Sequence, residues 1–138
     1  MSKVVRFGIS LPKGLSEKFD RLIKEVGYPN RSEAIRELIR KEFVSREWAK
    51  GDNVAGSITL VYDHSGREFL KRLTEVQHHH HHTIISTQHI HLDHHNCLEI
   101  VIIKGKPREA ESLLSELRSI KGLKHVSLAM ATTGKKIP

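Results

Sequence analysis

Two short stretches decide how the first fifty residues fold: VVRFGISL at residues 4–11 and NRSEAIRELIR at residues 30–40. Every second residue of the first stretch is apolar, and this alternation predicts a strand with one buried face. The apolar positions are Val5, Phe7, Ile9 and Leu11. The second stretch places Glu33 three residues after Asn30, which is the spacing of a capping box. It therefore predicts a helix with Asn30 as its N-cap.

Between these stretches, apolar residues recur at helical spacing from Leu15 to Val26, and Gly27 supplies a stop signal. The predicted order is strand, helix, helix over residues 1–50. A lone strand leaves unpaired backbone groups along its edges, so we expect it to pair antiparallel with the same strand of a second chain. RFGISL followed by NRSEAIRELIR resembles the ribbon-helix-helix family, whose two-stranded ribbon enters the major groove of DNA.

On this interpretation the polar face of the strand meets base edges, and the start of the second helix holds a phosphate through backbone N–H groups. The predicted DNA contacts are Arg6, Gly8, Ser10, Asn30, Arg31 and Ser32. Arg6 can donate two hydrogen bonds to guanine, whereas Gly8 has no side chain with which to read a base. The alternative is a dimerisation module without DNA, in which Arg6 only keeps a strand edge charged.

The charge distribution favours a polyanionic partner for this first segment. Residues 1–50 contain 12 Lys and Arg residues against 7 Asp and Glu residues, and the rest of the chain contains 11 against 9. A solvated basic surface would have the same composition. The single cysteine excludes an intrachain disulfide. Because the sequence has neither a signal-peptide pattern nor an apolar run of ~20 residues, we expect a cytoplasmic protein without a membrane span.

The second half of the chain has a different spacing of apolar residues, and a short linker of Gly51, Asp52 and Asn53 precedes it. Its periodicities predict the order β-α-β-β-α-β, which is the ferredoxin-like or ACT-type arrangement. The predicted elements lie at residues 57–62, 69–76, 83–92, 97–103, 110–117 and 126–131. The sequence therefore predicts an α+β protein with a β-α-α domain at residues 1–50 and an ACT-like domain at residues 54–138.

A cluster of metal-ligand residues marks this second domain, since nine of the 11 histidines lie between His78 and His95. His89 and His91 lie two residues apart on a predicted strand, so both rings occupy the same face. Cys97 opens the next strand, and His78 ends the preceding helix as a candidate fourth ligand. Three nitrogens and one sulfur suit Zn²⁺, Cu²⁺ or Ni²⁺, so the spacing predicts a transition metal without choosing among them.

Several alternatives use the same residues. A histidine-rich metal store would bind many weak ions, and an ACT-like domain could instead bind a small molecule on a metal-independent regulator. A metal-dependent hydrolase would need an open coordination position, which four protein ligands do not leave, so we expect no enzyme. Residues 79–82 and 94–95 are either accessory ligands or solvated surface histidines; His64 and His125 are interpreted as ordinary surface or structural residues.

A resemblance identifies the metal. The chain resembles the nickel-responsive transcriptional regulator (NikR) family in RFGISL, GYPNRSEAIRE, the region of Tyr62 to His64, CLEIVIIKG, and QHHHHHTIISTQHIHLDHHNCLEI at residues 77–100. The resemblance implies a homotetrameric repressor of nickel-uptake genes that binds double-stranded operator DNA and about one Ni(II) per subunit. It implies His89, His91 and Cys97 as ligands from one subunit and His78 from another, in a square-planar site.

The resemblance also bears on three carboxylates. Glu99 lies on the strand of Cys97 and is expected to accept a hydrogen bond that holds a ligand imidazole. Glu33 and Glu37 occupy positions at which the family binds a further cation, although the relatives carry a shorter acid at the second position. The alternative for both is a carboxylate favoured by the positive end of the helix dipole.

Overall fold

The computed structural model describes residues 3–138 and divides the chain into two compact units, Met1–Arg40 and Lys41–Pro138. The division falls within one helix, α2 (Arg31–Lys50), whose second half belongs to the larger unit. Within the described residues no helix is both long and apolar enough to cross a membrane.

The smaller unit contains α1 (Lys13–Val26) and the first turns of α2. Gly27 ends α1 in a left-handed conformation with φ of 89°, and its N–H donates to the carbonyl of Ile23 at 3.0 Å. The side chain of Asn30 accepts a hydrogen bond from the backbone N–H of Glu33 at 2.9 Å. This bond confirms Asn30 as the predicted N-cap of α2.

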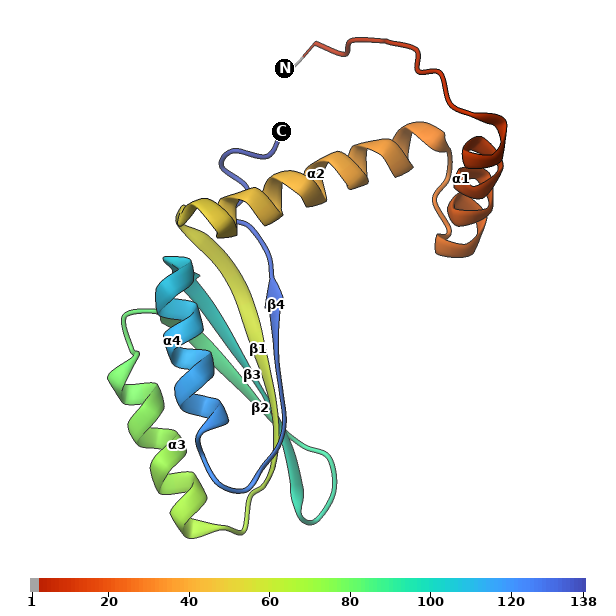
Figure 1. The fold of residues 1–138 in the computed structure, drawn as a ribbon. Coiled ribbons are helices and arrows are strands. Elements are labelled where there is room, and N and C mark those ends of the chain that lie inside the picture. Colours follow the sequence, from red (N-terminus) through yellow and green to blue (C-terminus); the bar gives the residue numbers. More distant parts are fainter. Residues whose placement is uncertain (1–2) are drawn as a thin grey trace. The chain divides into compact units, whose positions relative to one another are not determined.

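Residues 3–12 form neither a helix nor a paired strand within the one subunit described (Figure 1, red segment). The exposed fractions of the predicted apolar face are high: Val5 79%, Phe7 72%, Ile9 56% and Leu11 40%. No residue of α1 is buried either. The physical reason is that a single strand has no neighbour with which to form a ladder, so in the one subunit described its apolar face stays exposed, as do apolar side chains of both helices.

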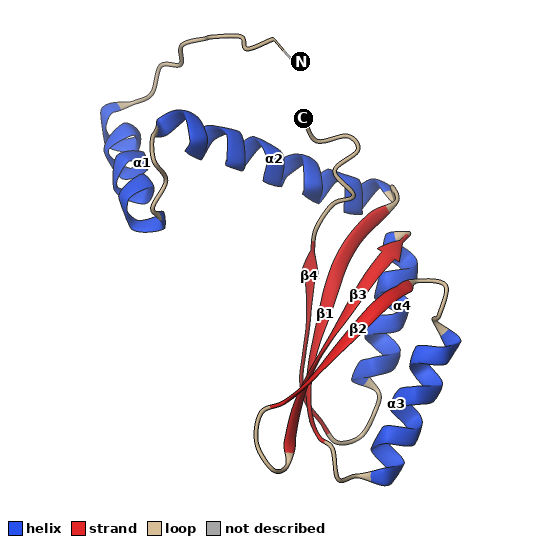
Figure 2. Cartoon of the chain, turned by 180° about the vertical axis from the view of Figure 1, so that it is seen from behind, coloured by secondary structure: helices blue, strands red, loops and turns tan. Residues whose placement is uncertain are grey.

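The larger unit is a four-stranded antiparallel sheet with the strand order β2-β3-β1-β4, and α3 and α4 lie over one of its faces (Figures 1 and 2). Its elements are β1 (Val54–Asp63), α3 (Arg67–His79), β2 (Ile84–His91), β3 (Asn96–Gly105), α4 (Pro107–Arg118) and β4 (Leu123–Met130). The predicted order β-α-β-β-α-β and the ferredoxin-like arrangement are confirmed.

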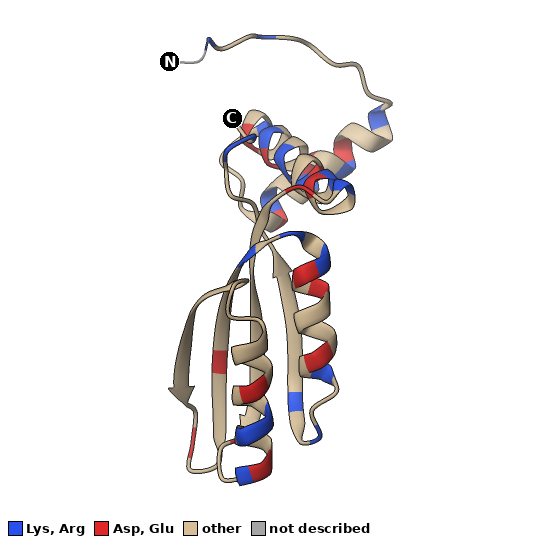
Figure 3. Ribbon diagram, turned by 90° about the vertical axis from the view of Figure 1, so that its left-hand side faces the viewer, with Lys and Arg blue, Asp and Glu red and all other residues tan. Residues whose placement is uncertain are grey.

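The core of this unit lies between the sheet and the two helices. Alternate residues of β1 are buried, as expected for a strand with one covered face. The fully buried core side chains include Ile58, Leu60, Val101, Leu113 and Leu117. Lys, Arg, Asp and Glu gather on α3 and α4, whereas the strands are largely uncharged (Figure 3). The sheet face and the inner sides of the helices therefore supply the apolar surface that stabilises the unit.

The end of α2 is anchored to the larger unit by two side chains. The indole nitrogen of Trp48 donates to the carbonyl of Ala131 at 2.9 Å, and Glu47 accepts a hydrogen bond from the hydroxyl of Thr132 at 2.7 Å. Both Trp48 and Glu47 are buried. These contacts explain why the last turns of the helix belong with the sheet rather than with α1.

Candidate metal centre

The register between β2 and β3 brings two predicted ligands together. His91 lies directly opposite Cys97, and His89 lies opposite Glu99, so all four residues share the face of the sheet that the helices cover. Nδ1 of His91 is 3.3 Å from Sγ of Cys97. The His89 and His91 rings stack with their centroids 5.3 Å apart. Because β2 is an edge strand, both imidazoles are exposed, whereas Cys97 is fully buried.

A third histidine joins this pair from another part of the chain. His64 follows β1, and the ligand atoms of His64, His91 and Cys97 all lie within 4.8 Å of one another. The rings of His64 and His91 meet edge to face at 5.1 Å. From the sequence, His64 was interpreted as an ordinary surface or structural residue, and this prediction missed its place beside Cys97. The feature that could have placed His64 near Cys97 is the topology of the sheet. β1 pairs antiparallel with β3, so the end of β1 lies beside Cys97 at the start of β3.

Beside this cluster, the carboxylate of Glu99 is buried and accepts two hydrogen bonds. One comes from the hydroxyl of Tyr62 at 3.0 Å, and the other comes from the side-chain amide of Gln77. Gln77 belongs to α3 and immediately precedes His78. The network therefore ties the C-terminal end of α3 to the strand that carries Cys97, a link that periodicity alone did not reveal.

The electrostatics of the cluster favour a protonated thiol in the metal-free subunit. Burial raises the pKa of Cys97, and the nearby carboxylates of Glu99, Asp93 and Asp63 raise it further. Asp93, in the turn between β2 and β3, has its pKa lowered to about 2 by hydrogen bonds from the side chain and backbone of Asn96. It is therefore a fixed negative charge near the thiol at neutral pH.

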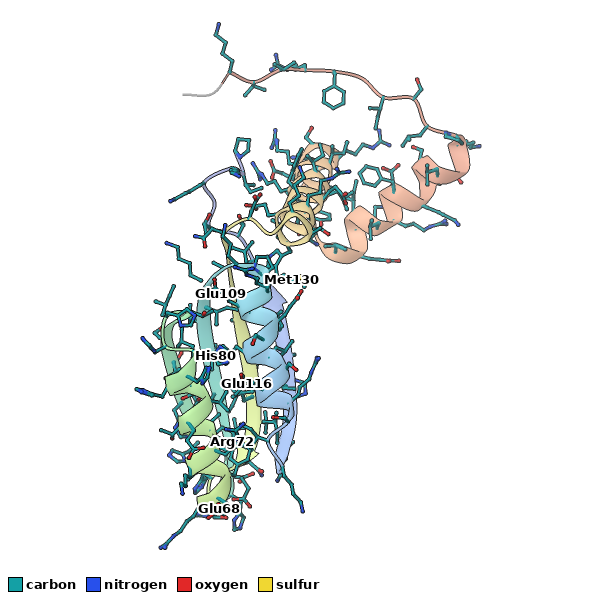
Figure 4. The ribbon with its side chains drawn as sticks, turned by 60° about the vertical axis from the view of Figure 1, so that its left-hand side comes forward. Glu68, Arg72, His80, Glu109, Glu116 and Met130 are labelled. Atoms are coloured by element: carbon teal, nitrogen blue, oxygen red, sulfur yellow. The ribbon has the colours of Figure 1, made fainter. Side chains whose placement is uncertain are left out.

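The run of histidines at residues 78–82 lies outside the cluster of His64, His91 and Cys97. His78 is exposed at the end of α3, with its ring 5.9 Å from that of His81. His80 is buried, and its Nε2 lies 3.2 Å from a carboxylate oxygen of Glu116 on α4 without the angles of a hydrogen bond. His80 and Glu116 are labelled in Figure 4. His80 thus faces inward, whereas the predicted ligand His78 is available to a neighbouring molecule.

The predicted DNA contacts lie in the smaller unit. Arg6, Gly8 and Ser10 are exposed in the extended segment, as are Asn30, Arg31 and Ser32 at the start of α2. The Arg31 guanidinium makes two hydrogen bonds of 2.8 Å to the carboxylate of Asp20, which joins α1 to α2.

Of the two carboxylates assigned to a cation site, Glu33 forms an ion pair with Arg36 one turn further along α2. Glu37 lies one turn beyond Glu33 on the same helix.

Comparison with known proteins identifies both parts of the chain. Residues 55–131 match the model of the NikR C-terminal nickel binding domain, and residues 5–43 match that of the ribbon-helix-helix protein, copG family. A solved structure of an uncharacterized protein from Thermotoga maritima covers 57% of this chain and 98% of its own, with a TM-score of 0.53 at 14% identity. That likeness concerns the fold alone.

Relatives that match over nearly their whole length carry the name "Putative nickel-responsive regulator". The one from Pyrococcus abyssi is 51% identical over 135 residues, covering 97% of this chain and 98% of the relative. The one from Syntrophus aciditrophicus is also 51% identical, and the one from Geobacter sulfurreducens is 50% identical with 99% of both chains covered. The chain belongs to the family of nickel-responsive regulators, with a ribbon-helix-helix domain followed by a NikR-type nickel-binding domain.

Proposed function

We propose that this protein represses nickel-uptake genes and that Ni(II), bound between subunits, gates its binding to a double-stranded operator. His89, His91 and Cys97 of one subunit would hold the ion together with His78 of the partner subunit, at about one ion per subunit in a homotetramer. The observation that carries the proposal is the pair formed by His91 and buried Cys97, with Nδ1 and Sγ 3.3 Å apart, within a domain of the nickel-binding family.

The donor set fits such an ion. At bond lengths of roughly 2.0–2.3 Å, neighbouring nitrogen and sulfur ligands lie about 3.1 Å apart at a right angle and about 3.6 Å apart in a tetrahedron. The separation of His91 and Cys97 falls between these values. When bound, nickel supplies a positive charge that favours the thiolate, so the raised pKa of Cys97 implies that a proton leaves with metal uptake.

Gating follows if two subunits share the site. His78 lies at the end of α3, and Gln77 beside it is hydrogen-bonded to Glu99 on the strand of Cys97. Fixing His78 against a neighbouring subunit would order α3, the sheet and their contacts as one body. The two DNA-binding heads of an oligomer would then favour one spacing, and two-headed binding gains strongly from effective concentration.

The heads would form by pairing residues 3–12 with the same segment of a second chain. Their exposed apolar side chains and the unburied α1 support this association. Arg6 and Ser10 would then face base edges, while the backbone at Asn30 to Ser32 would meet a phosphate. The Arg31 side chain, held by Asp20, would orient this helix start rather than read a base. Such a regulator would act in the cytoplasm, where its operator lies.

The test is operator binding by fluorescence anisotropy at one fixed salt concentration, with and without one equivalent of Ni²⁺. The DNA comes from upstream of nickel-transport genes in the same genome. Tight binding is expected only with nickel and is expected to vanish in the double variant His89→Ala/Cys97→Ala. His125→Ala, an exposed histidine on β4, is the matched control and should behave as the wild type. Equal binding with and without nickel would refute gating and favour a metal-independent regulator with a histidine-rich store.

A further inference from the structure

The C-terminal segment that follows β4, residues 131–136, passes beside the last turns of α2 (Figure 2). The buried indole of Trp48 donates a hydrogen bond to the carbonyl of Ala131 at 2.9 Å. The buried carboxylate of Glu47 accepts a hydrogen bond from the hydroxyl of Thr132 at 2.7 Å. Two consecutive residues of the helix are thus bonded to two consecutive residues of the C-terminal segment.

The linker between α2 and β1 is held by the same segment. The backbone N–H of Asp52 donates to the carbonyl of Glu47 at 3.0 Å, and the Asp52 carboxylate lies 3.5 Å from the ammonium group of Lys136. The backbone N–H of Ala131 donates to the carbonyl of Ala55 in β1 at 2.9 Å. The linker is therefore not a free hinge, because both the helix before it and the strand after it are bonded to the C-terminal segment.

The close approach of Trp48 to β1 depends on a glycine. A β-carbon at Gly56 would lie 3.4 Å from the indole ring and 2.6 Å from the carbonyl oxygen of Ala129. Because Gly56 has no side chain, the ring packs directly against the backbone of β1. The strand continues from this contact to Tyr62, whose hydroxyl donates to Glu99 beside the metal cluster. One strand therefore joins the anchored end of α2 to the candidate metal centre.

We propose that Glu47, Trp48 and Thr132 are positioning residues for metal-dependent operator binding. They fix the end of α2 to the nickel-binding sheet, so that the helix follows the sheet when the subunits are bridged. α2 is one helix from Arg31 to Lys50, and the proposed phosphate contact lies at its start. A rigid helix that is anchored at one end can carry coupling energy to the other. This inference rests on the proposed function, because it supplies the link that gating requires.

The anchor lies far from the metal ligands, so the two roles can be measured separately. Ala55 and Tyr62 are both in the extended strand β1, at a separation of roughly 23 Å. A change at Thr132 leaves His91 and Cys97 in place, so the nickel affinity without DNA should stay at its wild-type value. The quantity that should change is the ratio of operator affinities with and without nickel, because this ratio measures the coupling between the two sites.

The first experiment measures this ratio in the full chain by fluorescence anisotropy of labelled operator DNA, and nickel affinity by competition with a chromophoric chelator. Thr132→Val removes the hydroxyl that donates to Glu47 and should lower the ratio by roughly fivefold or more, since allosteric couplings span about 5–150-fold. Thr132→Ser keeps the hydroxyl and should retain the wild-type ratio. Thr133→Val is the matched control, because the Thr133 hydroxyl makes no hydrogen bond with any residue that the structure describes.

The second experiment needs neither nickel nor DNA. Trp48 is the only tryptophan of the chain, so tryptophan fluorescence reports on this contact alone. Deletion of residues 132–138 should shift the emission to longer wavelength and increase its quenching by acrylamide, because the indole gains access to water. Thr133→Val should do neither. Nickel affinity of the deletion variant close to that of the wild type would show that the larger unit remains folded.

Unchanged emission in the deletion variant would overturn the inference, and so would a Thr132→Val ratio equal to that of the wild type. A fall in the ratio that is matched by an equal loss of nickel affinity would make the segment purely structural and would also overturn it. Failure of the proposed function reads differently: the wild type itself would bind the operator equally with and without nickel, while the fluorescence contrast would persist.

Discussion

The hydrogen bond between Tyr62 and Glu99 gives the sharpest test of the structure. Tyr62 is 1% exposed and Glu99 is 6% exposed, so water cannot replace a missing donor. Tyr62→Phe keeps the ring that packs 4.8 Å from Phe69 and removes only the hydroxyl that donates to Glu99 at 3.0 Å. A hydrogen bond to a charged group contributes about 1.5–3 kcal/mol, and the carboxylate left behind has lost one of its two donors.

The expected loss in the free energy of unfolding is therefore about 1.5–3 kcal/mol, or roughly a 10- to 150-fold change in the unfolding constant. The assay is urea unfolding of the metal-free protein at fixed subunit concentration, because association and metal both shift apparent stability. Thr74→Val is the control: it removes a hydroxyl that donates at an exposed position of α3, and it should change stability by less than about 0.5 kcal/mol.

A Tyr62→Phe variant as stable as Thr74→Val would contradict this prediction, because it would mean that the Glu99 carboxylate does not depend on the Tyr62 hydroxyl. A double-mutant cycle with Glu99→Gln gives a second check. If the two side chains interact as the structure indicates, their combined effect should be smaller than the sum of the single effects.

Three further predictions concern packing and charge. Gly56→Ala should destabilise the larger unit by about 1–3 kcal/mol in urea unfolding, since the new methyl group would lie 2.6 Å from a backbone oxygen of β4; Gly14→Ala, where nothing lies within 4 Å, should not. Leu60→Ala, in the fully buried centre of β1, should cost about 2–5 kcal/mol, and a smaller loss would contradict the packing described. Hydrogen bonds from Arg31 lower the pKa of Asp20 below 3.8, so its stabilising contribution is present above that pH and lost as the pH falls through the lowered pKa. In the full chain, the NMR signals of residues 1–40 during acid titration should show the loss of this stabilising contribution in the wild type and not in Asp20→Asn.

Periodicity and turn chemistry were sufficient to predict the elements of the larger unit and the two helices that precede it. The alternation from Ile84 to His91 and the apolar run of β3 predicted adjacent strands, and Asn30 and Gly27 marked a helix start and a helix end. These are local properties, since each depends on residues within one or two turns of the chain. The juxtaposition of His91 and Cys97 was predictable for the same reason, because only six residues separate them.

The rest of the site depends on which distant segments meet, and local periodicity does not encode that. Pairing of β1 with β3 brings His64 to Cys97, and packing of α3 against the sheet gives Glu99 its bond from Gln77. Residues 3–12 illustrate the same point: their alternation specifies a strand face, but a ladder needs a second strand, and the one subunit described does not supply it. Sequence alone determined the helices and strands of the larger unit, and only long-range strand register decided which candidate metal ligands meet, because register is set by contacts between residues far apart in the chain.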